Sequence, residues 1–228
     1  MVAAAGWLQE RLGCGFSDPA LLERALTHRS HGPDNNERLE YLGDAVLSFV
    51  VAESLFRRFP TATEGELSRY RASLVSGEAL AAIAAEIGLG EQLRLGDGEM
   101  KSGGQRRATI LADALEALFG AIYLDCGLDA ARSAADRVFR NALAALPTAA
   151  ELKDPKTRLQ EWLQGRGFAL PAYTVLEVMG EPHDQRFRVR CDVGDLDLTA
   201  VADGNSRRRA EQEAAQRILE DPALRSER

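Results

Sequence analysis

The stretch NERLEYLGDAV, residues 36–46, has the spacing of a helix that packs into a core, yet it contains three carboxylates. Its apolar residues recur at intervals of three and four, which predicts a helix with one buried face. Glu37, Glu40 and Asp44 are spaced i, i+3 and i+7, so they share another face of that helix. No Lys or Arg lies four residues from Glu40 or Asp44. The helix therefore carries acids that no cation on the same face neutralises.

A second apolar stretch, TILADALEALFGAIYLD at residues 109–125, repeats the arrangement with Asp113 and Glu116 at i and i+3. Like charges that are close and partly desolvated raise one another's pKa unless a cation offsets them. Oxygen-only ligands favour Mg²⁺ or Mn²⁺ over zinc or copper. The two stretches together predict a divalent-metal site shared by two helices. At this point the alternative, that both acidic faces are merely solvated, stays open.

Length and composition describe a globular chain of ordinary make-up. With 228 residues and 45% hydrophobic content, it can bury one large core or two modest ones. No apolar run is long enough to span a bilayer and the start lacks the pattern of a secretory leader, so we expect a cytoplasmic protein without membrane contact. The three cysteines are far apart in sequence, which argues against a disulfide framework and against a paired-cysteine zinc site.

The net charge of −7 does not favour nucleic-acid binding, and neither half of the chain is basic overall. Binding to phosphate would therefore depend on local basic clusters. Two such clusters are present, at residues 106–107 and, more clearly, at residues 207–209. The global charge does not decide whether the chain binds nucleic acid.

The first part of the chain, residues 1–146, is predicted to be all-α, because period-two alternation is scarce in it. Asp18 and Ser76 are expected to cap helices, and GDGEMKSGGQRR is expected to be a loop between two helices. The predicted helices are Pro19–Leu26, Arg38–Phe59, Gly65–Leu74, Gly77–Ile87, Thr109–Asp125 and Asp129–Leu146.

The sequence pattern changes after Pro147. Residues 147–153 are predicted to form a linker, and residues 154–222 a small α+β domain of order α-β-β-β-α, with both helices on one face of an antiparallel sheet. The middle strand is the clearest, since apolar and charged residues alternate along it. The predicted elements are a helix at Thr157–Gln164, strands at Tyr173–Val178, Arg186–Val193 and Leu196–Ala202, and a capped helix at Ser206–Glu220.

Five segments of the chain resemble bacterial ribonuclease III, the double-strand-specific endoribonuclease, in the order found in that family. They are LTHRS (26–30), ERLEYLGD (37–44), EGELSRYRASLV (64–75), LGDGEMKSGGQRRATILADALEALFGAIYLD (95–125) and DPKTRLQEWLQ (154–164). The resemblance extends over nearly the whole chain. It implies a helical nuclease domain followed by a double-stranded-RNA-binding domain.

The resemblance also implies roles for the acids. Glu40, Asp113 and Glu116 would ligate Mg²⁺, for which Mn²⁺ could substitute, and no small-molecule cofactor is implied. Asp44 would be essential for catalysis together with Glu116. Glu37 and Glu64 would be peripheral acids at the rim of the same valley. Metal-activated water can hydrolyse a phosphodiester without a Ser, Cys or His nucleophile.

The family acts as a homodimer that cuts both strands of duplex RNA, leaving 5′-phosphate and 3′-hydroxyl ends with a short 3′ overhang. Ribosomal RNA precursors and structured messenger RNA are the substrates that the resemblance suggests. At the position of Tyr41 the family often has Phe, whose side chain packs against the partner subunit. Two rival hypotheses are a regulator that binds duplex RNA without cutting it, and a helical metal-binding or scaffold dimer with no RNA role.

Three groups of residues match the RNA-binding positions of the second domain. They would contact a minor groove, the next minor groove and the phosphates, because A-form RNA is recognised by shape, 2′-hydroxyls and backbone. The groups are Thr157, Gln160 and Glu161 on the first helix, His183 in the loop between the first two strands, and Arg207, Arg208 and Arg209 at the start of the last helix. In the first domain, Lys101, Arg106 and Arg107 are candidates for steering phosphate.

Overall fold

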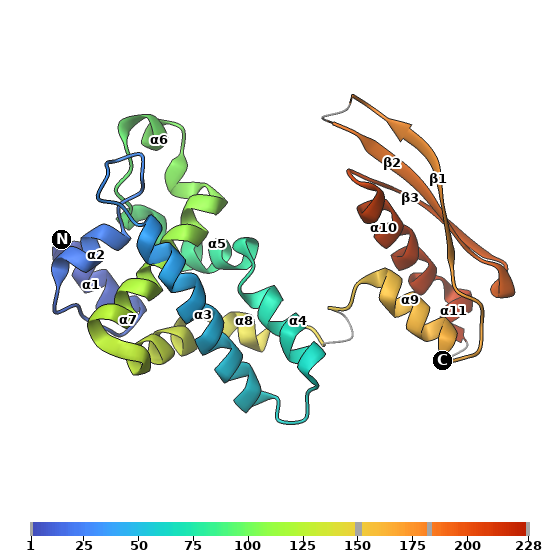
Figure 1. The fold of residues 1–228 in the computed structure, drawn as a ribbon, viewed down its shortest axis with the longest axis horizontal. Coiled ribbons are helices and arrows are strands. Elements are labelled where there is room, and N and C mark those ends of the chain that lie inside the picture. The colour runs from blue at the N-terminus through green and yellow to red at the C-terminus, as the bar shows by residue number, and fades with distance from the viewer. Residues whose placement is uncertain (1, 149–151, 182–183, 227–228) are drawn as a thin grey trace. The chain divides into compact units, whose positions relative to one another are not determined.

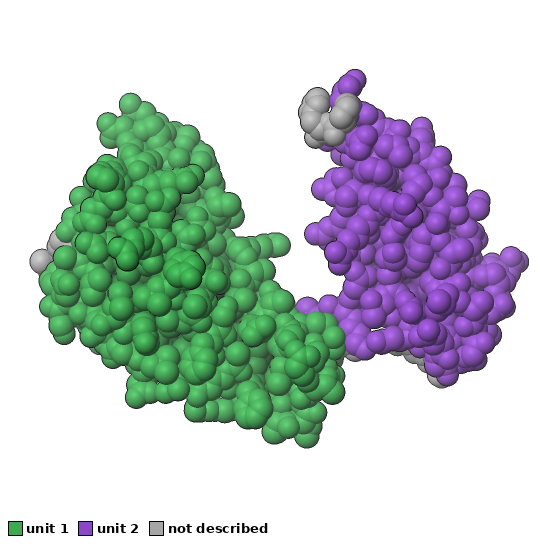
Figure 2. All heavy atoms as spheres, viewed as in Figure 1, with its two compact units in different colours: residues 1–149 green, residues 150–228 purple. Residues whose placement is uncertain are grey.

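The computed structural model describes residues 2–148, 152–181 and 184–226. They form two compact units, residues 1–149 and residues 150–228, which Figures 1 and 2 show. The division falls inside the segment predicted as a linker. Each unit has its own core and is described separately.

The first unit is helical, which confirms the all-α prediction. A single isolated bridge between Thr27 and Arg94 is the exception within the described part of this unit. The helices are α1 (Val2–Arg11), α2 (Pro19–Ala25), α3 (Glu37–Arg58), α4 (Glu64–Leu74), α5 (Gly77–Glu86), α6 (Asp97–Lys101), α7 (Ala108–Val138) and α8 (Arg140–Ala144), with short 3₁₀ turns at Leu89–Gln92 and Gly104–Arg106.

Local capping explains where several of these helices begin. The Asp18 carboxylate accepts from the backbone N–H of Ala20, and the Ser76 hydroxyl accepts from that of Ala79. Both caps agree with the sequence prediction, and each satisfies a donor that has no partner inside the helix.

Helices α3 and α7 form the centre of the first unit, with their most extensive contact against each other (Figure 1). Both present large apolar side chains that are fully buried, including Leu47 and Leu55 on α3 and Leu115, Leu118 and Phe119 on α7. Helix α5 packs on α7 as well. The two acidic stretches identified from the sequence therefore lie on the two helices that pack most extensively against each other.

Helix α7 is interrupted at Gly127, whose φ of 81° and ψ of −179° are non-helical, so it consists of two helices that meet at a kink, as the predicted helices Thr109–Asp125 and Asp129–Leu146 require. The second of them ends at Val138, and Arg140–Ala144 forms the separate α8. One prediction for the first unit needs correction. The stretch GDGEMKSGGQRR is not all loop, since Asp97–Lys101 forms the short helix α6. Helix α1 was not predicted.

The second unit has the predicted order α-β-β-β-α. Helix α9 (Pro155–Gln164) is followed by strands β1 (Ala172–Met179), β2 (Arg186–Val193) and β3 (Leu198–Gly204), which form an antiparallel sheet of order β1-β2-β3, and then by α10 (Arg207–Glu220) and the short α11 (Pro222–Ser226). The third strand begins later than predicted, because Gly194–Leu196 forms a 3₁₀ turn and Asp197 adopts a left-handed conformation.

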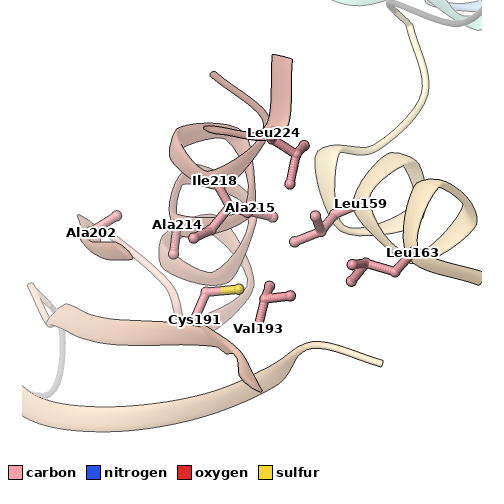
Figure 3. Packing of buried hydrophobic residues seen from close by; sticks show 9 residues of the cluster. All are labelled: Leu159, Leu163, Cys191, Val193, Ala202, Ala214, Ala215, Ile218 and Leu224. Carbon is pink, nitrogen blue, oxygen red and sulfur yellow. The ribbon is translucent and has the colours of Figure 1, made fainter. Parts of the chain in front are cut away.

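The core of the second unit lies between one face of the sheet and the two main helices (Figure 3). Leu159 and Leu163 reach it from α9, and Ala214 and Ile218 from α10. Cys191, on the clearest predicted strand, points into the same core, as its apolar alternation requires.

Polar contacts hold the start of α9 beside the start of α10, since Asp154 accepts a hydrogen bond from Gln212 and lies 3.6 Å from Arg208. Two of the three predicted groups of RNA-binding residues lie on these two helices.

Candidate metal centre and nucleic-acid interface

The structure brings together three of the predicted acids. One oxygen each from Glu40 on α3 and from Asp113 and Glu116 on α7 lies within 4.8 Å of the others. All three side chains belong to half-buried residues. The donor set contains only carboxylate oxygens, which is the chemistry that Mg²⁺ and Mn²⁺ prefer. Ligation itself stays a prediction.

Two glycines allow the helices that carry these acids to approach closely. A Cβ on Gly43 of α3 would overlap the backbone carbonyl of Glu116, and a Cβ on Gly120 of α7 would overlap that of Leu39. The contact is therefore backbone against backbone, and it lies directly beside the acids. The sequence prediction missed this pair. The signal was available, because glycine inside a helix costs stability and so indicates close packing.

The three clustered acids all have a raised pKa. Burial, and then the charges of Asp44, Asp113 and Glu40, raise the pKa of Glu116 to about 7. Burial also raises the pKa of Glu40, with Asp113 as the next cause, and burial raises the pKa of Asp113. Repulsion of this kind is relieved when a cation binds among the carboxylates.

The remaining predicted acids lie at different distances from this cluster. Asp44 is exposed and outside the group of three, but its charge contributes to the raised pKa of Glu116. Glu37 is exposed and lies 3.6 Å from Arg29. Glu64 begins α4 and accepts a hydrogen bond from Ser68. Within one chain, Glu64 lines a different hollow from that of Glu40 and Asp113.

A hollow of about 620 Å³ opens beside the cluster and has both acidic and basic walls. Glu40 and Asp113 line one part of it, and His28, Arg29 and Arg107 line another. Electrostatic interaction with His28 and Arg29 partly counteracts the effect of burial on the pKa of Asp113. Arg107 is held by Glu99 at 2.7 Å. The hollow therefore offers oxygen ligands for a cation next to cationic groups that could hold an anion.

The outer face of α3 carries aromatic side chains that nothing covers within the described chain. Tyr41 is 85% exposed, Phe56 is 70% exposed and Phe49 is about half exposed. The three are separated by seven or eight residues, so they form one stripe along the helix. Tyr41 lies on this stripe immediately after Glu40. Its predicted role at a subunit interface is compatible with this exposure.

The first helix of the second unit presents the polar surface predicted for RNA. Thr157, Gln160 and Glu161 are exposed on α9, and their spacing places them on one face. Glu161 is bound by Lys153, with Nζ–Oε distances of 2.6 and 2.9 Å. His183 lies outside the described residues.

The three arginines at the start of α10 differ in their surroundings. Arg207 Nε donates to Glu211 at 2.8 Å, while an Nη of Arg208 lies 3.6 Å from Asp154. Arg209 makes no ion pair with any part of the chain that the structure describes. Ser206 caps the helix by accepting from the backbone N–H of Arg209. The three arginines are therefore exposed, and two of them lie next to an acidic side chain.

No helix among the described residues combines the length and the apolar character needed to cross a membrane.

Comparison with known families accounts for both units. Residues 18–143 match the family described as Ribonuclease-III-like. Residues 155–221 match the double-stranded RNA binding motif. The two matches cover the acidic cluster and the arginine-bearing helix, respectively.

Individual relatives agree along almost the whole chain. The protein named Ribonuclease 3 from Alkalilimnicola ehrlichii is 61% identical over 213 residues, which are 93% of each chain. The protein of the same name from Methylococcus capsulatus is 54% identical over 219 residues, which are 96% of this chain and 95% of that one.

Solved structures match the first unit. A crystal structure of the ribonuclease III nuclease domain from Campylobacter jejuni has a TM-score of 0.58 and 42% identity, covering 62% of this chain and 97% of that one. A second structure of that domain, described as showing structural flexibility in a region involved in dimer formation, has a TM-score of 0.57 and 44% identity, covering 59% of this chain and 95% of that one. The chain belongs to the ribonuclease III family of double-stranded-RNA endoribonucleases.

Proposed function

We propose that this chain hydrolyses phosphodiester bonds in duplex RNA with Mg²⁺ held by Glu40, Asp113 and Glu116. The observation that carries the proposal is the convergence of one oxygen from each residue within 4.8 Å. The donor set contains neither imidazole nor thiolate, so it suits a hard cation. Mn²⁺ would substitute, because it accepts the same ligands.

The chain's own residues would hold the metal and place further acids around it. When bound, Mg²⁺ activates a water molecule and offsets the negative charge that gathers on the phosphate. The two helices hold the ligand carboxylates in a fixed geometry, because α3 and α7 touch through Gly43 and Gly120. Asp44 is proposed as a further essential acid, and Glu37 and Glu64 as peripheral ones.

The basic groups near the cluster would hold the RNA backbone. Arg107 lines the same hollow as Glu40 and Asp113. Lys101 ends α6 and Arg106 ends the 3₁₀ turn just before Arg107. We assign these three residues to phosphate steering. The second unit, residues 154–222, would bind the duplex through α9, the loop with His183 and the arginines of α10.

The enzyme is proposed to act as a homodimer in which each subunit cuts one strand. The exposed aromatic stripe on α3 supports a subunit interface, and one solved relative is described as having a region involved in dimer formation. The proposed products carry 5′-phosphate and 3′-hydroxyl ends with a short 3′ overhang. We propose ribosomal RNA precursors and structured messenger RNA in the cytoplasm as substrates.

A cleavage assay with a metal titration tests the proposal. A labelled RNA duplex and its separate single strands are incubated with the full chain in EDTA and in increasing Mg²⁺. Duplex cleavage that requires Mg²⁺, with the single strands left intact, is the expected result. Duplex retention with no cleavage at any metal concentration would instead identify a regulator that binds without cutting. Sequencing of the product ends checks the proposed end chemistry.

A further inference from the structure

Glu211 is a buried acid on the helix that carries the predicted phosphate-binding arginines. Only 8% of the residue is exposed, and the other buried polar or charged residues of the described chain are Thr27 and Asn36 in the first unit. An ionised carboxylate in such a place is costly unless it is paired and hydrogen-bonded. Its partners therefore indicate why it is there.

Each oxygen of Glu211 holds one cation. Lys156 Nζ of α9 donates to Oε2 at 2.5 Å, and Arg207 Nε donates to Oε1 at 2.8 Å. Burial would raise the pKa of Glu211, but the hydrogen bonds from Lys156 and Arg207 hold that pKa below its ordinary value. The carboxylate is therefore ionised at neutral pH and connects the start of α9 with the start of α10.

The bond from Nε fixes the orientation of the Arg207 guanidinium. This group is planar, so a carboxylate at Nε limits how its two terminal nitrogens can turn. The side chain is 64% exposed, and its terminal nitrogens make no hydrogen bond within the part of the chain that the structure describes. They remain available as a pair of donors, which is the geometry that binds phosphate in a bidentate manner.

We propose that Glu211 is a positioning residue for RNA binding, which holds the Arg207 guanidinium with its terminal nitrogens free to grip a backbone phosphate of the duplex. The inference rests on the proposed RNA-binding role of the second unit. Through Lys156, the same carboxylate links this phosphate contact to α9, the helix predicted to enter the minor groove. Arg208 is held less firmly, since its nearest acid is 3.6 Å away.

Simple electrostatics predicts the opposite effect for this acid. A negative charge near a phosphate-binding surface repels RNA, so neutralising it should tighten binding. If Glu211 positions Arg207, neutralising it should weaken binding even though the protein becomes less negative. The sign of the change therefore separates the two accounts.

The test measures binding of the full chain to an RNA duplex in EDTA, where no metal-dependent cleavage occurs. Glu211→Gln should raise the Kd about five- to tenfold, as expected for a charge-assisted contact. Glu213→Gln is the matched control, because Glu213 is on the same helix, is about half exposed and faces Arg217 at 3.6 Å. Its Kd should be unchanged or slightly lower. A Glu211→Gln variant that binds as tightly as the unaltered chain, or more tightly, overturns the proposal.

A second variant covers the case in which Glu211→Gln does not fold, as judged by its circular dichroism. Arg207→Lys keeps the charge but carries all its donors on a single nitrogen, which cannot bond Glu211 and also present the planar pair of nitrogens that binds phosphate in a bidentate manner. Its Kd should rise nearly as much as that of Arg207→Ala, and wild-type affinity in Arg207→Lys would refute the orienting role. In the Arg207→Ala background, Glu211→Gln should cause little further loss. If the unaltered chain does not bind duplex RNA, the proposed function fails and this inference fails with it.

Discussion

At the scale of single residues, Glu116 combines two properties. It is both a member of the converging trio and the acid whose pKa is raised furthest, to about 7. Unfavourable electrostatics of this kind destabilises the folded chain when no metal is bound, and it is a known cost of active sites. Two predictions follow from these two properties.

Glu116→Gln should abolish cleavage while leaving duplex binding intact. The amide keeps the size of the side chain but removes the anionic ligand, so turnover should fall by about 10²-fold or more. Single-turnover cleavage in Mg²⁺ and Kd in EDTA measure the two effects. A variant that cuts at the normal rate would mean that the acids of α7 are not ligands.

The same residue should make the metal-free protein less stable as the pH rises. A folded-state pKa above the unfolded value means that the folded chain binds the proton more tightly. The stability from this group is therefore present below pH 4.5 and is lost as the pH rises through about 7. In EDTA, Glu116→Gln should have a higher Tm than the unaltered chain at pH 7.5, and this difference should shrink at pH 5. An equal difference at both pH values would contradict the sign of the shift.

At the scale of elements, the contact between α3 and α7 determines where the acids lie. Both helices could be predicted from their apolar periodicity, and so could the acidic face of each. That the two helices meet could also be predicted from their acids, but the pairing of Gly43 with Gly120 at the point of contact could not, because these glycines are 77 positions apart in the sequence. The oxygens meet because two backbones touch there.

Adding one methyl group at this contact should separate the helices. Gly120→Ala would place its Cβ against the carbonyl of Leu39, and overpacking of this kind costs about 1–3 kcal/mol. We expect a lower Tm and a higher Mg²⁺ concentration for half-maximal cleavage. Gly77→Ala on α5 is the control, because a Cβ there meets nothing within 4 Å. Equal behaviour of the two variants would show that the close approach is unimportant.

Other elements show where sequence reasoning loses information. Helix α6 was missed because its five residues are too short to display a period. The start of β3 was placed too early because the left-handed Asp197 ends a turn that the apolar pattern alone does not reveal. Similarly, Arg207 was identified as a candidate, but its pairing with Glu211, and through it with the Lys156 of another helix, is a tertiary property.

For the whole molecule, the sequence was sufficient to predict an all-α nuclease unit followed by an α-β-β-β-α unit. Apolar residues recur at helical spacing in the first unit and alternate along the strands of the second, so the change after Pro147 was visible in the sequence. No apolar pattern within one chain shows how the two subunits of the proposed homodimer would meet. The exposed stripe of Tyr41, Phe49 and Phe56 indicates where the second subunit would bind.

A charge placed in this stripe should dissociate the proposed homodimer. Phe49→Asp should shift the chain from dimer to monomer, because burying an unpaired carboxylate in an apolar interface is costly. Light scattering after size-exclusion chromatography measures the mass. Met100→Asp, at an exposed apolar side chain of α6, is the control and should leave the mass unchanged. A monomeric unaltered chain, or a dimeric Phe49→Asp variant, would rule out this interface.

Glu40 and Tyr41 are consecutive residues of α3, so this helix would set the distance between the proposed metal site and the proposed subunit interface. Consecutive residues of an α-helix differ by about 100° in direction and about 1.5 Å in height, so a metal held by Glu40 and a subunit contact at Tyr41 would lie at a fixed offset from each other. In a symmetric pair, this offset and its copy would set the interval between the two cuts. The spacing of the cuts would then be a constant of the protein, the same for every duplex whatever its base sequence.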